Sequence, residues 1–142
     1  MNNLFVYTIG HGARKKDQFL RLLKEYNIQV LIDVRRWPNS KISHFCKEDL
    51  EKWLSDVGIS YIWLGDTLGG YRKGGYEKYM TSKAFLNGVN QILQIAKRNR
   101  VCLMCLEISP KGCHRRFISS YLNKLGVSVI HILSEGKFEI IK

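Results

Sequence analysis

The chain has 142 residues, 45% of them hydrophobic, which is enough for one globular domain over residues 1–142 and too few for two. Its 23 Lys and Arg against 12 Asp and Glu give a formal net charge of +11, which favours polyanionic partners, nucleic acid first. No segment has the apolar length of a signal peptide or a membrane span, so we expect a cytoplasmic protein without membrane contact whose four cysteines stay reduced.

Apolar runs of strand length alternate with helical patterns along the chain. In order, the sequence predicts strands at 4–9, 28–34, 59–64, 101–106 and 127–133, and helices at 17–26, 47–57, 82–98 and 113–125. A glycine-rich basic loop occupies 65–75, and 138–141 is a candidate for a short edge strand. The strand runs are almost wholly apolar, as in strands that are buried on both faces. We therefore expect an α/β fold, a three-layer α/β/α sandwich with a mainly parallel five-stranded sheet, Rossmann- or flavodoxin-like.

Polar residues of catalytic type follow the predicted strands at the points where they end. They are Gly10 and His11, Asp33 with Arg35 and Arg36, the 69–72 loop with Arg72, and Glu107 followed by Cys113, His114, Arg115 and Arg116. The carboxyl ends of parallel strands meet at one edge of the sheet, where open α/β sheets bind their ligands. We therefore expect these side chains to form one site.

The start of the helix at 113–125 has the features of an anion site. The first turn of a helix offers unpaired N–H groups and a partial positive charge. His114, Arg115 and Arg116 lie in that turn. Cations there oppose the helix dipole, which a bound anion would offset. The alternative is that the arginines are surface residues that pair with Glu107 or Asp33.

Cys113, at or near this helix start and beside arginines, is predicted to have a lowered thiol pKa. It is a candidate nucleophile, metal ligand or redox thiol, and the alternative is a small buried residue. Zinc binding by Cys105, Cys113 and His114 is disfavoured because no CxxC or HxxxH spacing is present. We therefore expect neither a metal nor a cofactor.

Three residues are candidates for proton transfer. His11 is a possible general acid or base, or else a structural hydrogen-bonding residue in a turn. Asp33 and Glu107 are the carboxylate candidates, although for Asp33 we favour a role in orienting an arginine.

A basic set interleaved with aromatic residues suits phosphate and base recognition. It contains Arg35, Arg36, Arg72, Lys73, Arg115 and Arg116, with Trp37, Tyr71 and Tyr76 between them. Of these, Arg35, Arg115 and Arg72 are the candidates for bidentate phosphate contacts. Stacking rings beside basic residues are typical of nucleotide or single-strand binding. The alternative is that Trp37 packs under the Pro38 turn.

With these residues in view, the chain resembles the family called domain of unknown function 488 over nearly its whole length. The resemblance rests on Thr8-Ile9-Gly10-His11, Asp33-Val34-Arg35 with Pro38 and Ser40, Leu68-Gly69-Gly70, Cys105-x-Glu107-x-x-Pro110-x-x-Cys113-His114-Arg115, and His131-Ile132. One departure is Gly12, where the family more often has serine, which weakens a hydroxyl role there. The resemblance implies an α/β fold and a shared site made from these motifs, and it implies no reaction.

These observations predict an anion-binding, enzyme-like site that acts on or binds a nucleotide or nucleic acid. Two alternatives stay open: a non-catalytic nucleic-acid-binding module, and a cysteine-based redox or sulfur-transfer protein. The sequence indicates neither a substrate nor an oligomeric state.

Overall fold

The computed structural model describes residues 4–141; residues 1–3, which the signal-peptide argument included, and residue 142 lie outside it. Within the described residues, six strands form one sheet in the order β3-β2-β4-β1-β5-β6. They are β1 (Phe5–Gly10), β2 (Val30–Asp33), β3 (Ser60–Trp63), β4 (Val101–Cys105), β5 (Ser128–Ser134) and β6 (Lys137–Ile141). All neighbouring strands are parallel except β5 and β6, which are antiparallel.

The predicted α/β class is confirmed, and the predicted count of five strands is wrong. The sixth strand is the edge candidate at 138–141, which begins one residue earlier. A tight turn whose Gly136 has φ 72° reverses the chain after β5, so β6 folds back onto β5 from Ser134↔Lys137 to Val129↔Ile141. A positive φ suits glycine, and this turn places an antiparallel hairpin at the edge of the parallel sheet.

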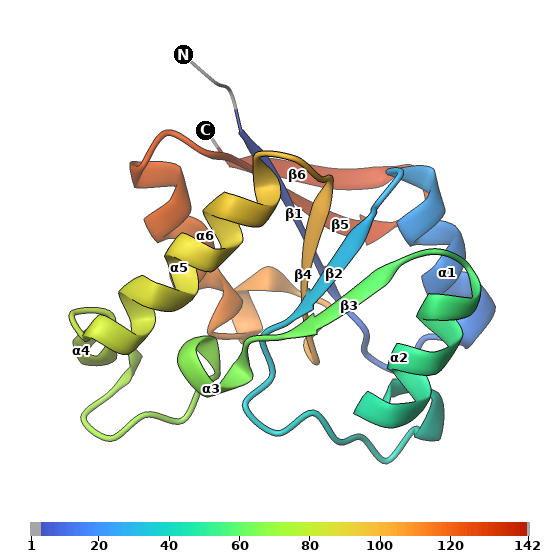
Figure 1. Cartoon of the computed structure of the whole chain (residues 1–142), viewed down its shortest axis with the longest axis horizontal. Coiled ribbons are helices and arrows are strands. Elements are labelled where there is room, and N and C mark those ends of the chain that lie inside the picture. Colours follow the sequence, from blue (N-terminus) through green and yellow to red (C-terminus); the bar gives the residue numbers. More distant parts are fainter. Residues whose placement is uncertain (1–3, 142) are drawn as a thin grey trace.

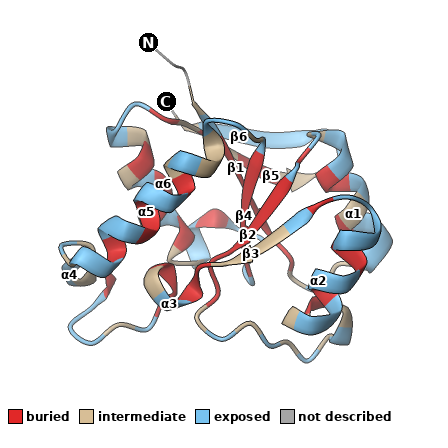
Figure 2. Ribbon diagram, in the orientation of Figure 1, coloured by how far each residue is buried: buried red, intermediate tan, exposed pale blue. Residues whose placement is uncertain are grey.

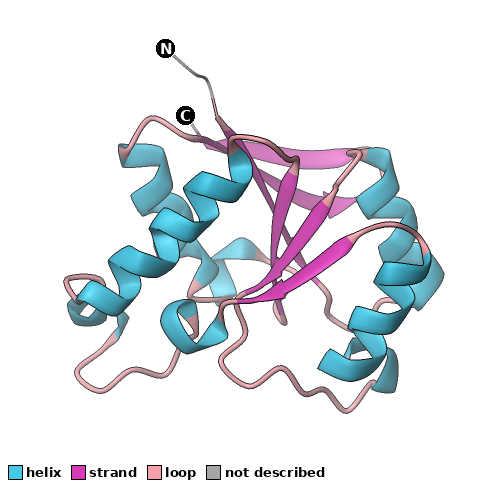
Figure 3. Ribbon diagram, viewed as in Figure 1, coloured by secondary structure: helices cyan, strands magenta, loops and turns pink. Residues whose placement is uncertain are grey.

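Within residues 4–141, helices and short helical turns connect the strands (Figure 3). The α-helices are α1 (Lys16–Glu25), α2 (Lys47–Asp56), α3 (Gly65–Leu68), α4 (Tyr76–Tyr79), α5 (Lys83–Ala96) and α6 (Arg115–Lys124), and the 3-10 turns are η1 (Ser43–Phe45) and η2 (Pro110–Gly112). The Ser82 side chain caps α5 by accepting from the Phe85 N–H. The segment predicted as a loop at 65–75 contains α3, and α4 follows it. Four residues are too few for an apolar period to appear in the sequence.

Helices cover both faces of the sheet, so the hydrophobic core has two halves (Figures 1 and 2). On one face α1 and α2 bury Phe19, Leu23, Leu50 and Leu54 against Ile9, Leu31 and Cys102. On the other face α5 and α6 bury Phe85, Ile92, Ile118 and Leu122 against Val6, Ile32 and Leu103. Alternate residues of β1, β2 and β4 thus supply opposite cores, which is why their sequences are continuously apolar.

The strand order brings the carboxyl ends of β1, β2 and β4 together. The chain crosses from β1 to β2 and β3 towards one edge, then returns to place β4 between β2 and β1. In the Rossmann and flavodoxin sheets the first two strands are neighbours, so this order differs from both. Among residues 4–141, no helix has the length and apolar character needed to cross a membrane.

Gly10 ends β1 where the loop after β4 passes directly over it. A Cβ atom at this position would lie 1.7 Å from the Glu107 carbonyl oxygen and 2.7 Å from the Ile108 Cα atom. Both are backbone atoms, which cannot move aside as a side chain can. The absence of a side chain at Gly10 therefore lets the turn after β1 and the loop after β4 meet.

We expect Gly10→Ala to lower the free energy of unfolding by about 3 kcal/mol, because the new methyl group must push the loop away from β1. The measurement is urea unfolding followed by circular dichroism. Gly112→Ala is the matched control, since its Cβ atom would meet nothing closer than 3.6 Å. Equal effects of the two substitutions would contradict the steric explanation.

Candidate active site

A cleft of about 860 Å³ opens where β1, β2 and β4 end. The lining residues come from the segments that follow these strands and from the loop after α3, and they are His11, Gly12, Ala13, Arg35, Arg36, Trp37, Asn39, Ser40, Lys41, Ile42, Gly70, Tyr71, Cys105, Leu106, Glu107, Gly112, Cys113 and His114. The cleft thus brings together five predicted site residues, His11, Arg35, Glu107, Cys113 and His114. The other four, Asp33, Arg72, Arg115 and Arg116, do not line it.

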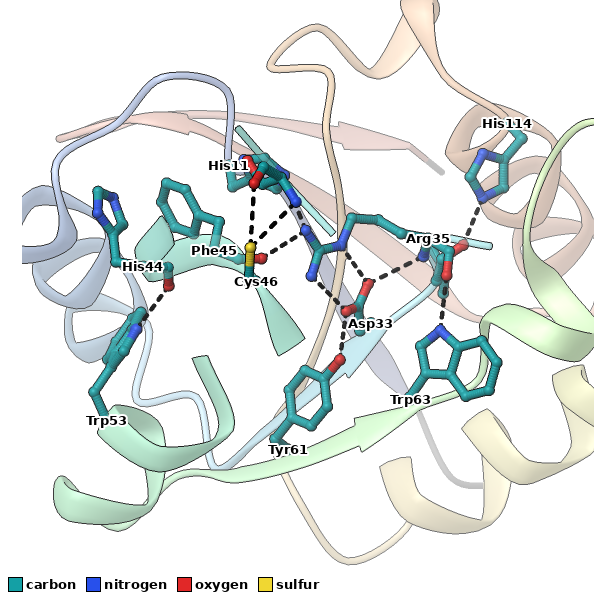
Figure 4. A network of polar contacts seen from close by, with 12 residues as sticks. His11, Asp33, Arg35, His44, Phe45, Cys46, Trp53, Tyr61, Trp63 and His114 are labelled. Atoms are coloured by element: carbon teal, nitrogen blue, oxygen red, sulfur yellow. Dashed lines mark hydrogen bonds and ion pairs between the residues drawn. The ribbon is translucent and has the colours of Figure 1, made fainter. Parts of the chain in front are cut away.

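Asp33 and Arg35 form a buried ion pair beneath the cleft (Figure 4). Arg35 Nη2 donates to Asp33 Oδ2 over 2.8 Å, while Arg35 Nε and the Arg35 backbone N–H donate to Oδ1 over 2.9 and 3.0 Å. Tyr61 Oη donates to Oδ2 over 2.5 Å, and burial, reinforced by the Asp33 charge, raises the pKa of Tyr61. With four donors around it, the Asp33 carboxylate is occupied in orienting Arg35.

His11 lies against the other side of the Arg35 guanidinium (Figure 4). Its Nδ1 lies 2.9 Å from the Gly12 carbonyl oxygen and therefore carries the proton, so Nε2 accepts from Arg35 Nη1 at 3.4 Å. Burial lowers the pKa of His11 to about 4, which keeps the ring neutral at pH 7. The ring also stacks on Phe45, whose carbonyl oxygen accepts from Arg35 Nη1 over 2.7 Å. Both ring nitrogens of His11 are thus hydrogen-bonded, one to the Gly12 carbonyl oxygen and the other to Arg35.

Arg115 is fully buried beneath the loop that follows β4. Its Nη1 donates to Thr8 Oγ1 over 2.8 Å, and its Nη2 donates to the carbonyl oxygens of Glu107 and Ile108 over 2.7 and 3.2 Å. Among residues 4–141, no carboxylate pairs with it. Burial, together with the Arg115 charge, lowers the pKa of His131 to about 4. Arg115 therefore holds the loop in place from below and presents no donor to the cleft.

Two thiols and an imidazole meet at one wall of the cleft. Cys113 Sγ lies 2.7 Å from Cys105 Sγ and 3.5 Å from His114 Nδ1. The opposite ring nitrogen, His114 Nε2, donates to the Val34 carbonyl oxygen over 2.9 Å. This bond fixes the proton of the neutral ring on Nε2 and leaves the Nδ1 lone pair facing the Cys113 thiol.

The groups around the Cys113 sulfur favour its ionised form. The side-chain hydrogen bond from Cys105 lowers the pKa of Cys113 most, and His114 and the Arg115 backbone N–H, 3.4 Å away, add to this effect against the opposing effect of burial. The same hydrogen bond, together with burial, raises the pKa of Cys105. Once ionised, Cys113 would supply the first turn of α6 with an anion from within the chain.

The remaining predicted anion ligands lie elsewhere. Arg72 folds back to donate to the carbonyl oxygens of Gly65, Asp66 and Gly69, as arginines do at helix ends, and it covers the Tyr79 ring at 4.1 Å. Arg116 is exposed and lies over the Phe117 ring at 4.6 Å.

Glu107 lines the cleft and is exposed. The η2 turn separates it from Cys113 along the chain. Its side chain packs near Gly112, where a Cβ atom would lie 3.6 Å from Glu107 Cγ. Of the two predicted carboxylates, Glu107 is therefore the one that reaches the cleft.

A metal site is not formed in the described part of the chain. Within residues 4–141, no group of three or more His, Cys, Asp and Glu side chains is arranged to hold an ion. Two thiolates on one tetrahedral zinc ion lie about 3.7 Å apart, as zinc–sulfur bonds of roughly 2.3 Å dictate. The 2.7 Å between Cys105 Sγ and Cys113 Sγ is closer than that geometry permits.

An exposed aromatic pair stands at the mouth of the cleft. The Trp37 and Tyr71 rings have centroids 5.5 Å apart, and the side chains are 59% and 84% exposed. Arg36 links the two loops, since its guanidinium lies 5.2 Å from the Trp37 ring and its Nη1 donates to the Tyr71 carbonyl oxygen. Tyr71 has a φ of 59°, a left-handed conformation that costs energy for a residue with a side chain.

Sequence reasoning missed several residues of the cleft. Cys105 entered only as a possible zinc ligand and as part of the family motif, and Lys41 did not enter at all. Phe45 and Tyr61 were also missed; they do not line the cleft, but they bind Arg35 and Asp33. One signal was available for Cys105, because it lies one residue before the end of the strand predicted at 101–106 and so close to the same sheet edge as Asp33. Lys41 and Phe45 follow β2 in an irregular loop, whose path no apolar period predicts.

The family model described as "Domain of unknown function DUF488" matches residues 15–122, which is more than half of the chain. These residues include β2, β4, the first turns of α6 and most of the cleft lining. No curated protein matches the sequence.

Replacing Asp33 with Asn leaves the Arg35 charge buried without a counter-charge. We expect this substitution to lower the free energy of unfolding by about 3–5 kcal/mol, measured by urea denaturation. The matched control is Glu135→Gln in the exposed Arg21–Glu135 pair, whose side chains are 65% and 64% exposed and whose loss should cost less than about 1 kcal/mol. A loss as small for Asp33→Asn as for the control would show that the cleft does not depend on this pair.

Proposed function

The chain belongs to the DUF488 family, and on that footing we propose that its cleft is the active site of an enzyme with Cys113 as nucleophile and a nucleotide or nucleic acid as substrate. The observation that carries the proposal is the placement of Cys113 beside a histidine of fixed tautomer. A nucleophile within reach of a base that a third group orients is the arrangement common to cysteine enzymes. Here the third group is the Val34 carbonyl oxygen, bound by His114 Nε2.

The roles follow from the proton positions. His114 Nδ1 takes the thiol proton, and the resulting thiolate is stabilised by the donors from Cys105 and Arg115. The Cys113 Sγ lone pair attacks an electrophilic atom of the substrate as the bond from that atom to its leaving group breaks. The leaving group departs with the proton from His114 Nδ1, and water then releases the bound group from sulfur. Glu107, exposed at the cleft, is the candidate to assist that water.

The cleft mouth supports a phosphate-bearing planar substrate. Its lining has three cationic side chains, Arg35, Arg36 and Lys41, against the single carboxylate of Glu107. Trp37 and Tyr71 offer exposed ring faces beside Arg36, and base stacking on such rings is strong and tolerant of sequence. The net charge of +11 would attract a polyanion from a distance.

The fold class agrees with this location. We infer that the protein is a three-layer sandwich that is Rossmann- or flavodoxin-like in its layers, though not in its strand order. In such sheets ligands bind outside the carboxyl ends of the strands, at the point where the strand order reverses. The neighbouring ends of β1, β4 and β2 are that point here.

The second candidate is a non-catalytic nucleic-acid-binding module. The exposure of Trp37 and Tyr71 favours it, because a stacking platform at the surface needs no nucleophile behind it. The two candidates differ in what they require of Cys113 and His114: a binding module keeps its affinity for nucleic acid when either side chain is replaced, and it has no reaction to lose.

We expect iodoacetamide to alkylate Cys113 at nearly the same rate between about pH 6 and pH 8, because the thiolate persists below the pKa of an ordinary thiol, which is roughly 8.5. The measurement is intact-mass spectrometry with peptide assignment. His114→Asn should raise the pH at which the rate levels off, because it removes one of the groups that stabilise the thiolate and leaves the larger effect of Cys105 in place. Cys46→Ser is the control, since Cys46 does not line the cleft and its thiol is hydrogen-bonded with the Ser40 backbone. An ordinary pH profile for Cys113 in the wild type would remove the nucleophile from the proposal.

The substrate class is tested by fluorescence anisotropy with single-stranded DNA, duplex DNA and RNA over a salt series, with free nucleotides as competitors. We expect single strands to bind and the affinity to fall steeply with salt. Trp37→Ala should weaken binding by about 1–3 kcal/mol through lost stacking, while Arg116→Ala, outside the cleft, should do so only slightly. Absence of binding at low salt would exclude a nucleic-acid substrate. Equal effects of the two substitutions would place binding outside the cleft.

A further inference from the structure

Cys105 is buried at the end of β4 and takes no part in the proposed reaction beyond its hydrogen bond to Cys113. The two sulfur atoms are 2.7 Å apart, which is only about 0.7 Å more than a disulfide bond length. Cys105 is 1% exposed, whereas Cys113 is half-buried, and both line the cleft. A small molecule in the cleft therefore reaches Cys113 first and has Cys105 directly behind it.

The other two cysteines are not arranged in this way. Cys46 exchanges hydrogen bonds with Ser40, and Cys102 is fully buried in the core on the opposite face of the sheet from Cys105. Residues 102 and 105 face opposite cores because they are an odd number of positions apart on β4. Among the four free cysteines, Cys105 and Cys113 are thus the pair in sulfur contact.

We propose that Cys105 and Cys113 form a reversible disulfide when hydrogen peroxide enters the cleft, and that this bond switches the Cys113 nucleophile off. The inference rests on the two thiols and not on the proposed substrate. Cys113 and its environment match a redox-sensing thiol, which is accessible, ionised and placed next to a resolving cysteine.

The chemistry balances in two steps. The Cys113 thiolate attacks one oxygen of hydrogen peroxide, the O–O bond breaks, and the products are Cys113 sulfenic acid and hydroxide. The Cys105 sulfur then attacks the Cys113 sulfur, the S–O bond breaks, and the sulfenic hydroxyl group leaves with the Cys105 proton as water. Reduction by two electrons from a dithiol restores both thiols.

The chain between the two cysteines can follow the small movement required. Residues 106–109 are exposed, and the η2 turn at Pro110–Gly112 lies outside the sheet. The loop is held from below by Arg115 through the Glu107 and Ile108 carbonyl oxygens. The anchor keeps Cys105 in register with β4, so the movement falls on Cys113 at the start of α6.

The test treats the full chain with hydrogen peroxide, blocks remaining thiols with N-ethylmaleimide and reads the intact mass. We expect two of the four cysteines to escape the label in the oxidised protein, and all four to take it after dithiothreitol. Trypsin cuts at Lys111 and Arg115, so the bond would join the peptide 101–111 to the peptide 112–115. Since the first peptide also contains Cys102, Cys102→Ala must give the same linked pair.

Cys105→Ser and Cys105→Ala are the decisive variants, with Cys46→Ser as the matched control. Without Cys105, Cys113 should proceed to the irreversible sulfinic acid, roughly tenfold faster than in the wild type. Circular dichroism verifies that both variants fold, and the second variant serves if the first does not. The proposal is overturned if the wild type reaches the sulfinic acid as fast as the variants, or if the linked peptides do not appear.

The two proposals fail separately. A disulfide in a protein that binds no oligonucleotide or nucleotide would leave the redox inference standing and remove the substrate. Oligonucleotide binding by a protein whose peroxide treatment yields no linked peptides would do the reverse.

Discussion

Asp33 ends β2 out of contact with water, and its negative charge is tolerable there because Arg35 turns back to meet it two residues later. From that position the guanidinium reaches across to the Phe45 carbonyl oxygen and to His11, so one cation joins the loop after β2 to the turn after β1. Val34, held between the two charged residues, presents its carbonyl oxygen to His114. The orientation of the imidazole beside Cys113 thus depends on the ion pair beneath it.

Arg115 makes a complementary contribution from the other side of the cleft. It is a buried cation whose two terminal nitrogens donate only to neutral oxygens, those of Thr8, Glu107 and Ile108, while its Nε has no partner within residues 4–141. A cation without a buried counter-charge favours negative charge and disfavours further positive charge nearby. In keeping with that field, the Arg115 charge adds to burial in lowering the pKa of His131, and it opposes the rise in the pKa of Cys105 that the Cys113 hydrogen bond and burial cause.

The location of the cleft could be predicted from the sequence, and the contacts that its residues make could not. Apolar strand runs identify a parallel sheet, and polar residues after β1, β2 and β4 must then share one edge, as His11, Arg35 and Cys113 do. The direction in which each of these side chains points could not be predicted in the same way. Arg115 and Arg116 are adjacent on α6, yet helical geometry sends one into the core and the other into solvent. The contacts of Arg72 could not be predicted either. Its guanidinium binds carbonyl oxygens at the end of α3, and that helix is too short to produce an apolar periodicity in the sequence.

The position of β4 between β1 and β2 also determines when the cleft comes into existence. β1 and β2 share no ladder of their own, and Val6 and Val30 both pair with Val101. A nascent chain that has emerged only as far as β3 can pair β2 with β3, yet nothing joins His11 to Arg35 across the gap that β4 will fill. Closing that gap needs contacts of high sequence separation, which form slowly. The segment that closes it carries Cys105 and leads directly to Cys113, so the thiols arrive together with the strand that completes the floor beneath them.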